Sequence, residues 1–266
     1  MNTTRLPTLF ISHGGGPWPY IPDMRQKFAA TAEALQNLPA TLPAKPKAIL
    51  AISGHWEAPQ FSVATSANPS MEYDYYGFPE HTYHVQYPAQ GDVALALKVK
   101  HLLNASGIAC DEDAARGFDH GVFVPLMLMY PNADVPVVML SMKSGYDPVA
   151  HIKLGEALMP LRDEGVLIIG SGLTYHNMRG FGRRESYAPS VQFEQYLNSA
   201  ITDPDPEKRH QALINWEQAP FARAVHPRED HLIPLMVVAG AAGNDVGQCI
   251  FTDTVFEVLM ASYRFG

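Results

Sequence analysis

Three short hydrophobic segments dominate the pattern of the chain, and each is followed by small residues and a histidine. They are residues 8–12 before His13, residues 48–52 before His55, and residues 166–170 before His176. Unbroken apolar runs of this length are typical of parallel strands that are buried on both faces. The carboxyl ends of parallel strands lie along one edge of a sheet, where α/β proteins bind their ligands. Because imidazole is a common metal ligand near neutral pH, we expect the three histidines to meet at a mononuclear metal centre.

Further strands and helices are predicted along the rest of the chain. Apolar runs predict strands near residues 61–67, 135–142 and 251–265, and helical spacing predicts helices near residues 23–38, 92–104, 122–130, 149–164, 188–201 and 207–216 and from His231 onward. Pro160 should kink the helix that contains it. Alternating strands and helices favour an α/β fold of three layers, α/β/α, with a largely parallel central sheet. No linker or repeat divides the chain, so we expect one domain over residues 1–266.

Composition and charge argue against several classes of protein. Hydrophobic residues make up 47% of the 266 residues, enough for a substantial core, and 19 Lys and Arg against 27 Asp and Glu give a net charge of −8. Such a surface repels nucleic acid and anionic lipid, so we expect neither as a partner. No run approaches the roughly 20 apolar residues of a membrane span, and the apolar run near the N-terminus is too short for a secretory signal.

Cysteine usage points to a reducing compartment. Cys110 and Cys249 do not form a C-x-x-C pair, and two thiols cannot build a disulfide framework for a chain of this length. Together with the absence of targeting signals, this predicts a cytoplasmic protein.

Eleven histidines cannot all be ligands, and position separates them. Those on predicted helices or in plain loops, His101, His151, His210 and His226, are expected to have structural or surface roles, and His81 and His84 lack the helix context of an H-E-x-x-H zinc site. His231 begins a helix and reaches the site only if that helix faces it. His120, in the segment GFDHG, could equally be a turn residue bonded to Asp119.

A series of short segments carries a resemblance to a known family. In chain order they are SHGGGP, SGHWE, YDYYGFP with YPAQG, GFDHG, YHNMR and EDHLIPL, and they extend from about residue 8 to residue 240. The series resembles the extradiol ring-cleavage dioxygenases of the LigB superfamily, in particular the bacterial and plant 4,5-DOPA dioxygenase branch. The triple glycine after His13 and Gln90 within YPAQG are small departures from that pattern.

The resemblance implies a metal site and a reaction. It implies a non-haem Fe(II) enzyme with His13, His55 and His231 as metal ligands, His176 as the acid/base residue and His120 as a proton donor that does not bind the metal. Members of this branch are also found with zinc, which would make Zn(II) a resting form with His176 as its fourth ligand. The implied reaction is extradiol cleavage of a catechol such as DOPA by O₂ to a muconic semialdehyde.

The residue types suit this chemistry on their own terms. Three protein ligands leave coordination positions open, and non-haem iron oxygenases need those for substrate and O₂. A catechol that chelates a metal must lose a phenolic proton, and a histidine with a pKa of about 6.5 can accept it at neutral pH.

An aromatic loop at residues 73–91 is expected to form a wall or lid over the site. A planar, mostly apolar ring is best held between aromatic and aliphatic walls. The candidates for substrate contact are Trp56, Tyr73, Tyr75 and Phe78, each of which could instead be a packing residue. Arg179 could pair with a substrate carboxylate, and a plain surface arginine is an equal alternative.

Two other functions remain open from the sequence. A zinc hydrolase could use the same histidines to activate water, with His176 or Glu57 as the base. A binding protein without catalytic activity could also use this fold, since fold does not determine function.

Overall fold

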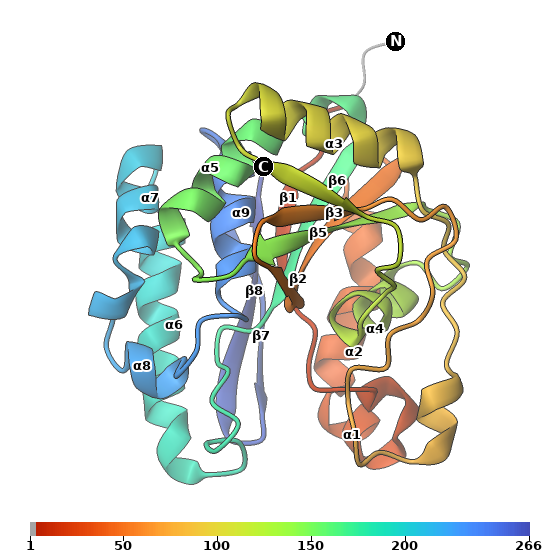
Figure 1. Ribbon diagram of the computed structural model, residues 1–266. Coiled ribbons are helices and arrows are strands. Elements are labelled where there is room, and N and C mark those ends of the chain that lie inside the picture. The colour runs from red at the N-terminus through yellow and green to blue at the C-terminus, as the bar shows by residue number, and fades with distance from the viewer. Residues whose placement is uncertain (1–3) are drawn as a thin grey trace.

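A mixed sheet of eight strands forms the centre of the structure, a computed structural model that describes residues 4–266 (Figure 1). The strands lie in the order β4-β3-β5-β2-β6-β1-β8-β7. The four central strands run parallel to one another and are β5 (Val137–Lys143), β2 (Ala48–Ala58), β6 (Val166–Gly172) and β1 (Thr8–Ser12). Helices cover both faces, which explains why these strands are apolar throughout. The predicted three-layer α/β fold with a largely parallel centre is confirmed.

Antiparallel pairing occurs toward both edges of the sheet. At one edge β8 (Val258–Phe265) runs antiparallel to β1 and to β7 (Gly247–Val255). At the other, β3 (Phe61–Ala64) runs antiparallel to β5, and β4 (Cys110–Asp113) pairs in parallel with β3. Strand β4 was not predicted, because its four residues read CDED and show no apolar run.

The helices form one layer on each face of the sheet (Figure 1). On one side lie α3 (Val93–Ala105), α5 (Pro148–Leu158), α6 (Tyr187–Ile201), α7 (Pro206–Ile214) and α9 (Ile233–Ala242), and on the other lie α1 (Pro22–Lys27), α2 (Ala29–Asn37) and α4 (His120–Met129). A short helix, α8 (Ala222–Val225), precedes α9. Within residues 4–266, no helix combines the length and the apolar character needed to cross a membrane.

Two predicted helices are interrupted. The segment 23–38 was predicted as one helix, but Phe28 leaves the helical conformation with φ −98° and ψ 22° and separates α1 from α2. Its ring stacks on Trp18 with the ring centroids 4.8 Å apart, a tertiary contact that sequence periodicity does not report. The segment 149–164 divides at Leu158, and Pro160 lies in the 3-10 helix Met159–Glu164, so the predicted kink is confirmed.

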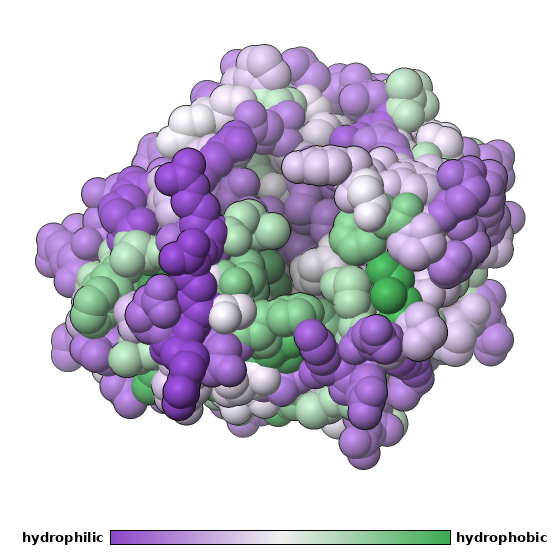
Figure 2. All heavy atoms as spheres, turned by 90° about the horizontal axis from the view of Figure 1, so that it is seen from below, coloured by the Kyte–Doolittle hydropathy of each residue, from purple (hydrophilic) through white to green (hydrophobic). Residues whose placement is uncertain are grey.

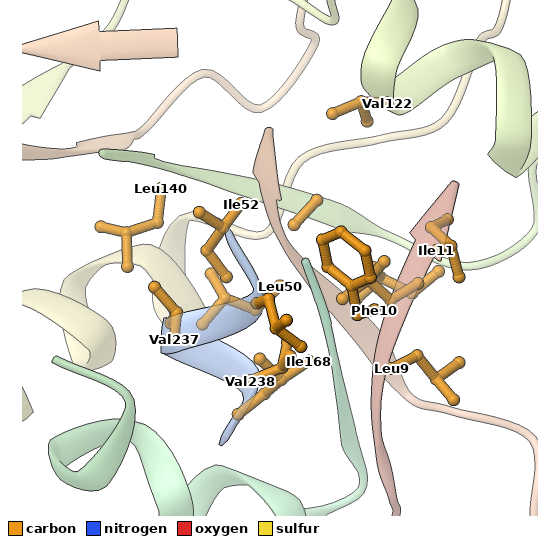
Figure 3. Close-up of a cluster of buried hydrophobic side chains, with 14 of the residues drawn as sticks. Leu9, Phe10, Ile11, Leu50, Ile52, Val122, Leu140, Ile168, Val237 and Val238 are labelled. Carbon is orange, nitrogen blue, oxygen red and sulfur yellow. The ribbon is translucent and has the colours of Figure 1, made fainter. Parts of the chain in front are cut away.

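The hydrophobic core joins the central strands to the helices (Figure 3). Almost all side chains of this core are fully buried. The residues labelled in Figure 3 are Leu9, Phe10, Ile11, Leu50, Ile52, Val122, Leu140, Ile168, Val237 and Val238. Truncating a side chain such as Leu50 to alanine in a core of this density costs about 2–5 kcal/mol of folding free energy.

Candidate metal centre

Five histidines lie together where the parallel strands end. His13 follows β1, His55 lies near the end of β2, and His176 follows the loop after β6. His120 begins α4, and His231 precedes α9. The rings of His13 and His231 are fully buried or nearly so, and His55 and His176 are partly exposed to the same cavity. The structure therefore brings together all five of the histidines that were singled out from the sequence.

The imidazole nitrogens of His13, His55 and His231 converge. His55 Nε2 lies 3.2 Å from His13 Nε2 and 3.1 Å from His231 Nε2. Two nitrogens that bind the same ion at about 2.0–2.1 Å, with an angle between about 90° and the tetrahedral value at the ion, lie roughly 2.8–3.4 Å apart. The observed spacing matches that of nitrogen ligands to a single metal ion.

A hydrogen-bond chain determines the tautomer of His13. The hydroxyl of Ser171 donates to the carbonyl oxygen of Gly121, so its oxygen must accept from His13 Nδ1 at 3.0 Å. The proton of neutral His13 is therefore on Nδ1. Its Nε2 carries a free lone pair that points at His55.

Carboxylates set the same tautomer in the other two rings. His55 Nδ1 lies 3.2 Å from Asp74 Oδ2. His231 Nδ1 lies 3.0 Å from Asp230 Oδ1, at an ion-pair distance whose angle does not suit a hydrogen bond. Both Nδ1 atoms lie beside a carboxylate, which favours the tautomer with the proton on Nδ1 and the lone pair on Nε2. Lone pairs at these distances repel each other unless a cation lies between them, so the donor set fits a metal ion.

Burial favours the metal-binding protonation state. It lowers the pKa of His13 and of His55 well below the usual value, and it lowers the pKa of His231 to about 4. The neighbouring imidazoles lower these pKa values further, because protonating one ring disfavours protonating the next. All three rings are neutral at pH 7, the form in which imidazole binds a metal.

Two aspartates each hold a pair of histidines. Asp74 Oδ1 lies 2.7 Å from His120 Nδ1, while its other oxygen faces His55. Asp230 Oδ1 lies 3.1 Å from His176 Nδ1 and also faces His231. Burial acts to raise the pKa of both aspartates, but their hydrogen bonds to histidine outweigh it and lower both values. The sequence analysis missed both aspartates as members of the site.

The donor atoms fall into two groups that could each hold a metal ion. One group with donor atoms within 4.8 Å of one another is His13, His55 and His120, and a second is His176, Asp230 and His231. His55 joins the groups through its 3.1 Å contact with His231 Nε2. This direct contact between nitrogens favours His231 over His120 as the third ligand.

Glycines allow the chain to approach closely around these rings. A Cβ at Gly172 would lie 2.1 Å from the carbonyl oxygen of His231, which accepts from Leu173 N at 3.0 Å. A Cβ at Gly121 would lie 2.5 Å from Ser53 Oγ and 2.9 Å from the ring of His55. Larger residues at either position would displace a histidine.

The histidines lie in a cavity of about 510 Å³, on the face of the molecule at which the parallel strands end. Figure 2 shows this face hollowed, with hydrophobic residues around the opening. The lining residues other than the five histidines are Gly14, Gly15, Gly16, Met24, Phe28, Tyr75, Tyr76, Phe78, Leu173, Met178, Phe181, Phe256 and Met260.

The predicted substrate-contact residues divide into two groups. Tyr75 and Phe78 line the cavity. Trp56 follows His55 on the strand and does not line the cavity, and its ring packs against the Arg116 guanidinium at 5.1 Å. Tyr73 is also absent from the lining and donates its hydroxyl to the carbonyl oxygen of Val85 at 2.7 Å.

Two charged candidates lie outside the cavity. Arg179 is exposed and is not part of the lining. Glu57, considered as a hydrolytic base, forms an ion pair with Arg228 at 2.5 Å, with both side chains partly exposed to solvent. Neither residue lines the cavity that contains the histidines.

Other histidines serve the scaffold. His226 is fully buried and donates from Nε2 to the carbonyl oxygen of Thr174 at 3.0 Å. His151 is also buried, on α5, and lies between the backbone of Asp147 and that of Lys143. Their expected structural roles agree with these contacts.

Comparison with known proteins shows which family the chain belongs to. Residues 7–265 match the family described as the catalytic LigB subunit of aromatic ring-opening dioxygenase. The chain belongs to the LigB family. It is therefore an aromatic ring-opening dioxygenase by family, and its histidine group is compatible with the metal dependence of LigB enzymes.

Several LigB relatives match over most of their length. The chain is 41% identical to a 4,5-DOPA dioxygenase extradiol of Beta vulgaris, over 90% of this chain and 87% of that protein. It is 35% identical to the dioxygenase tasH of Hapsidospora irregularis, over 98% and 85%. A crystal structure of an uncharacterised protein from Escherichia coli K12 superposes with a TM-score of 0.79 at 30% identity, covering 98% of this chain and all of that one.

Proposed function

We propose that this protein is an extradiol dioxygenase that opens a catechol ring with O₂ to give a muconic semialdehyde, at a mononuclear metal ion held by His13, His55 and His231. The observation that carries the proposal is the convergence of three Nε2 lone pairs at the floor of an apolar cavity. Four relatives of this chain at 34–41% identity are named 4,5-DOPA dioxygenases, which makes DOPA one candidate substrate.

Fe(II) is the proposed active metal and Zn(II) a resting form in which His176 is the fourth ligand. Nitrogen donors suit both ions, and Fe(II) in addition supplies open positions for catechol and O₂ and electron transfer between them. His176 stacks on His231 with ring centroids 3.4 Å apart, so it lies within reach of the same ion.

His176 is the proposed acceptor of the phenolic proton. Its Nδ1 is held by Asp230 at 3.1 Å, so the neutral ring has its lone pair on Nε2 and lines the cavity. The catechol O–H bond breaks, and its proton moves to Nε2. The imidazolium so formed is stabilised by the Asp230 carboxylate and can return the proton later, when the ring opens.

His120 is the proposed second proton donor, on the other side of the ligands. Asp74 fixes its ring through Nδ1, and the ring centroid lies 4.0 Å from that of His55. Both atoms of O₂ enter the product, and the electrons that reduce O₂ come from the ring that is cleaved, so the reaction needs no external reductant. The histidines need only move protons.

Tyr75 and Phe78 are the proposed ring-holding residues. The Tyr75 hydroxyl donates to the carbonyl oxygen of Thr82 at 2.6 Å, so its ring, not its hydroxyl, faces the cavity. Phe78 meets Tyr75 edge to face with centroids 5.6 Å apart. Together they provide an apolar wall that excludes water from the bound catechol.

We also propose one catalytic domain over residues 1–266 and a cytoplasmic location. The candidate ligands come from both ends of the chain and meet on one sheet, which supports the first. Cys110 and Cys249 are free thiols, which suits a reducing compartment.

Anaerobic loading with Fe(II), followed by catechol and air-saturated buffer, tests the proposed function. We expect one O₂ consumed per catechol and a coloured semialdehyde, and neither with the zinc-loaded protein. Hydrolysis would consume no O₂. Stoichiometric iron without O₂ uptake for any catechol would refute ring cleavage.

A further inference from the structure

Beyond the histidines, the wall of the cavity consists of apolar side chains and three glycines. Among the residues that the structure describes, those of the wall include no Lys, Arg, Asp, Glu, Asn, Gln, Ser or Thr. The tyrosines are the only other members with a polar atom, and the Tyr75 hydroxyl is already bonded to the chain. A substrate substituent that enters this space meets mainly carbon and sulfur atoms, and the remaining polar groups of the wall are the Tyr76 hydroxyl and the backbone of Gly14, Gly15 and Gly16.

Packing behind this wall fixes its shape. Phe28 stacks on Trp18 and meets Phe256 edge to face with centroids 6.0 Å apart. Phe256 lies on the tight β7–β8 turn with a left-handed φ of 50°, and its carbonyl oxygen accepts from Gly182 N at 2.7 Å. The turn is thereby tied to the loop that carries Met178 and Phe181, so the apolar space is already formed without a ligand.

The nearest cations are not part of the lining. Lys27 Nζ lies 4.5 Å from the ring centroid of Phe256, but Lys27 itself is exposed and absent from the cavity wall. Arg179 is exposed next to Met178 and is also absent from the lining. A substrate carboxylate against this wall would have no lysine or arginine partner, and burying an unpaired charge is strongly unfavourable. A substrate ammonium group could still lie over an aromatic ring of the wall. The carboxylate is therefore the substrate group that the wall disfavours.

We infer that the substrate of this site is a catechol with an uncharged, apolar substituent, and not one that carries an amino acid carboxylate. The inference rests on the proposed catechol dioxygenase function and specifies its substrate. The volume of about 510 Å³ lies within the range of about 300–1,000 Å³ found for pockets that hold ligands larger than a bare catechol. The apolar wall is where the substituent would lie.

A measurement of binding affinity tests this inference independently of the proposed catalytic activity. The probes are 4-propylcatechol, dopamine, 3-(3,4-dihydroxyphenyl)propionate and DOPA, which share a ring and differ in side-chain charge. Anaerobic titration calorimetry with zinc-loaded protein measures affinity without turnover. 4-Propylcatechol and the propionate differ only in a methyl group against a carboxylate. The buried methyl group should strengthen binding up to about fourfold, and the cost of burying an unpaired carboxylate adds to this difference, so we expect 4-propylcatechol to bind at least tenfold more tightly than the propionate and DOPA.

O₂ consumption by the iron-loaded protein gives the second measurement. We expect kcat/KM for 4-propylcatechol to exceed that for the two carboxylates at least tenfold. Equal or higher values with DOPA would overturn the inference and leave the proposed function intact. Tight binding of 4-propylcatechol without any O₂ uptake would refute the proposed function and leave the binding preference standing. Failure of every catechol to bind would refute both.

Variants that add or remove a charge test whether the cavity wall is the source of the substrate selectivity. Met178 is 71% exposed and lines the cavity, so Met178→Arg adds a cation there at little cost to folding. It should improve kcat/KM for the carboxylates at least fivefold relative to 4-propylcatechol. Leu97→Arg is the matched control, because Leu97 is 48% exposed on α3 and remote from the site. Lys27→Met and Arg179→Met complete the test: a selective loss of activity with the carboxylates in either would overturn the inference.

Discussion

Asp74 joins His55 to His120 through the two oxygens of a single carboxylate, 3.2 Å from one Nδ1 and 2.7 Å from the other. Asp230 lies between His231 and His176 in a similar way, but it faces both Nδ1 atoms with the same oxygen, Oδ1, at 3.0 Å and 3.1 Å. Each bridge therefore couples a proposed metal ligand to a proposed proton carrier. The orientation of the proton carriers relative to the metal is set by these two carboxylates and not by the strands.

Replacing Asp74 by asparagine should separate positioning from metal binding. Asparagine keeps the shape but replaces one carboxylate oxygen by an NH₂ donor, so one of the two Nδ1–H groups loses its acceptor. We expect Asp74→Asn to reduce kcat by about ten- to a hundredfold, to weaken metal binding by no more than a similar factor, and to change the pH profile of kcat. Separate measurement of kcat, KM and metal content tests this.

Asp111→Asn is the matched control for this change, because Asp111 is exposed on β4. It should leave all three quantities unaltered. Wild-type kinetics and an unchanged pH profile in Asp74→Asn would show that the bridge has no part in turnover.

Alanine variants should distinguish the two possible ligand sets. If His13, His55 and His231 hold the metal, replacing any one of them should reduce the bound metal to a small fraction, measured by elemental analysis of purified protein. His176→Ala should retain iron and lose turnover, because it removes the proton acceptor. His120→Ala should also retain iron, with a smaller loss of rate. Full metal content in His231→Ala together with loss in His120→Ala would assign the third position to His120.

The positions of three histidines could be predicted because each follows a buried apolar run. The strand pattern that places His13, His55 and His176 at one edge of the sheet is local, and the end of each run is visible in the sequence. His231 required knowledge of where α9 packs. The carbonyl oxygen of His231 contacts the end of β6 next to Gly172. This contact joins segments about 60 residues apart, and no local pattern encodes it.

Asp74 and the cavity wall could not be predicted, for a related reason. Asp74 lies in a loop without periodicity, whose course is set by hydroxyl-to-backbone bonds such as Tyr73 to Val85. Phe28 has the spacing of a core residue in one long helix, yet it interrupts that helix and lines the cavity. Hydrophobic pattern reports that a side chain is buried, but not whether it packs against protein or against a ligand.

Gly172→Ala should damage the site through the backbone. The added Cβ would lie 2.1 Å from the His231 carbonyl oxygen, so the segment with Asp230 and His231 must move. We expect a loss of about 1–3 kcal/mol in the free energy of unfolding, together with weaker metal binding. Urea unfolding and elemental analysis measure the two effects. Gly15→Ala meets no atom within 4 Å and should leave the unfolding free energy within about 0.5 kcal/mol, so equal losses in the two variants would contradict the steric argument.

Buried neutral histidines should make the protein less stable as the pH falls. Burial lowers the pKa of His226 to about 3 and that of His151 to about 4. Because these pKa values are below the value of about 6.5 expected in the unfolded chain, acid protonates the unfolded state first. Stability is unaffected above about pH 7, and each histidine removes up to about 1.4 kcal/mol per pH unit as the pH falls from about 6.5 toward its folded pKa.

His226→Gln isolates one contribution to this pH dependence. Glutamine keeps a donor for the Thr174 carbonyl oxygen but does not titrate. In metal-free protein, urea unfolding between pH 7.5 and pH 5 should show a shallower loss of stability for His226→Gln than for wild type, by up to about 1.4 kcal/mol per unit. The other buried histidines titrate in both proteins, so the difference between them belongs to His226. His101→Gln, at an exposed position on α3, should match wild type throughout, and parallel curves for His226→Gln and wild type would show that His226 takes up its proton equally in both states.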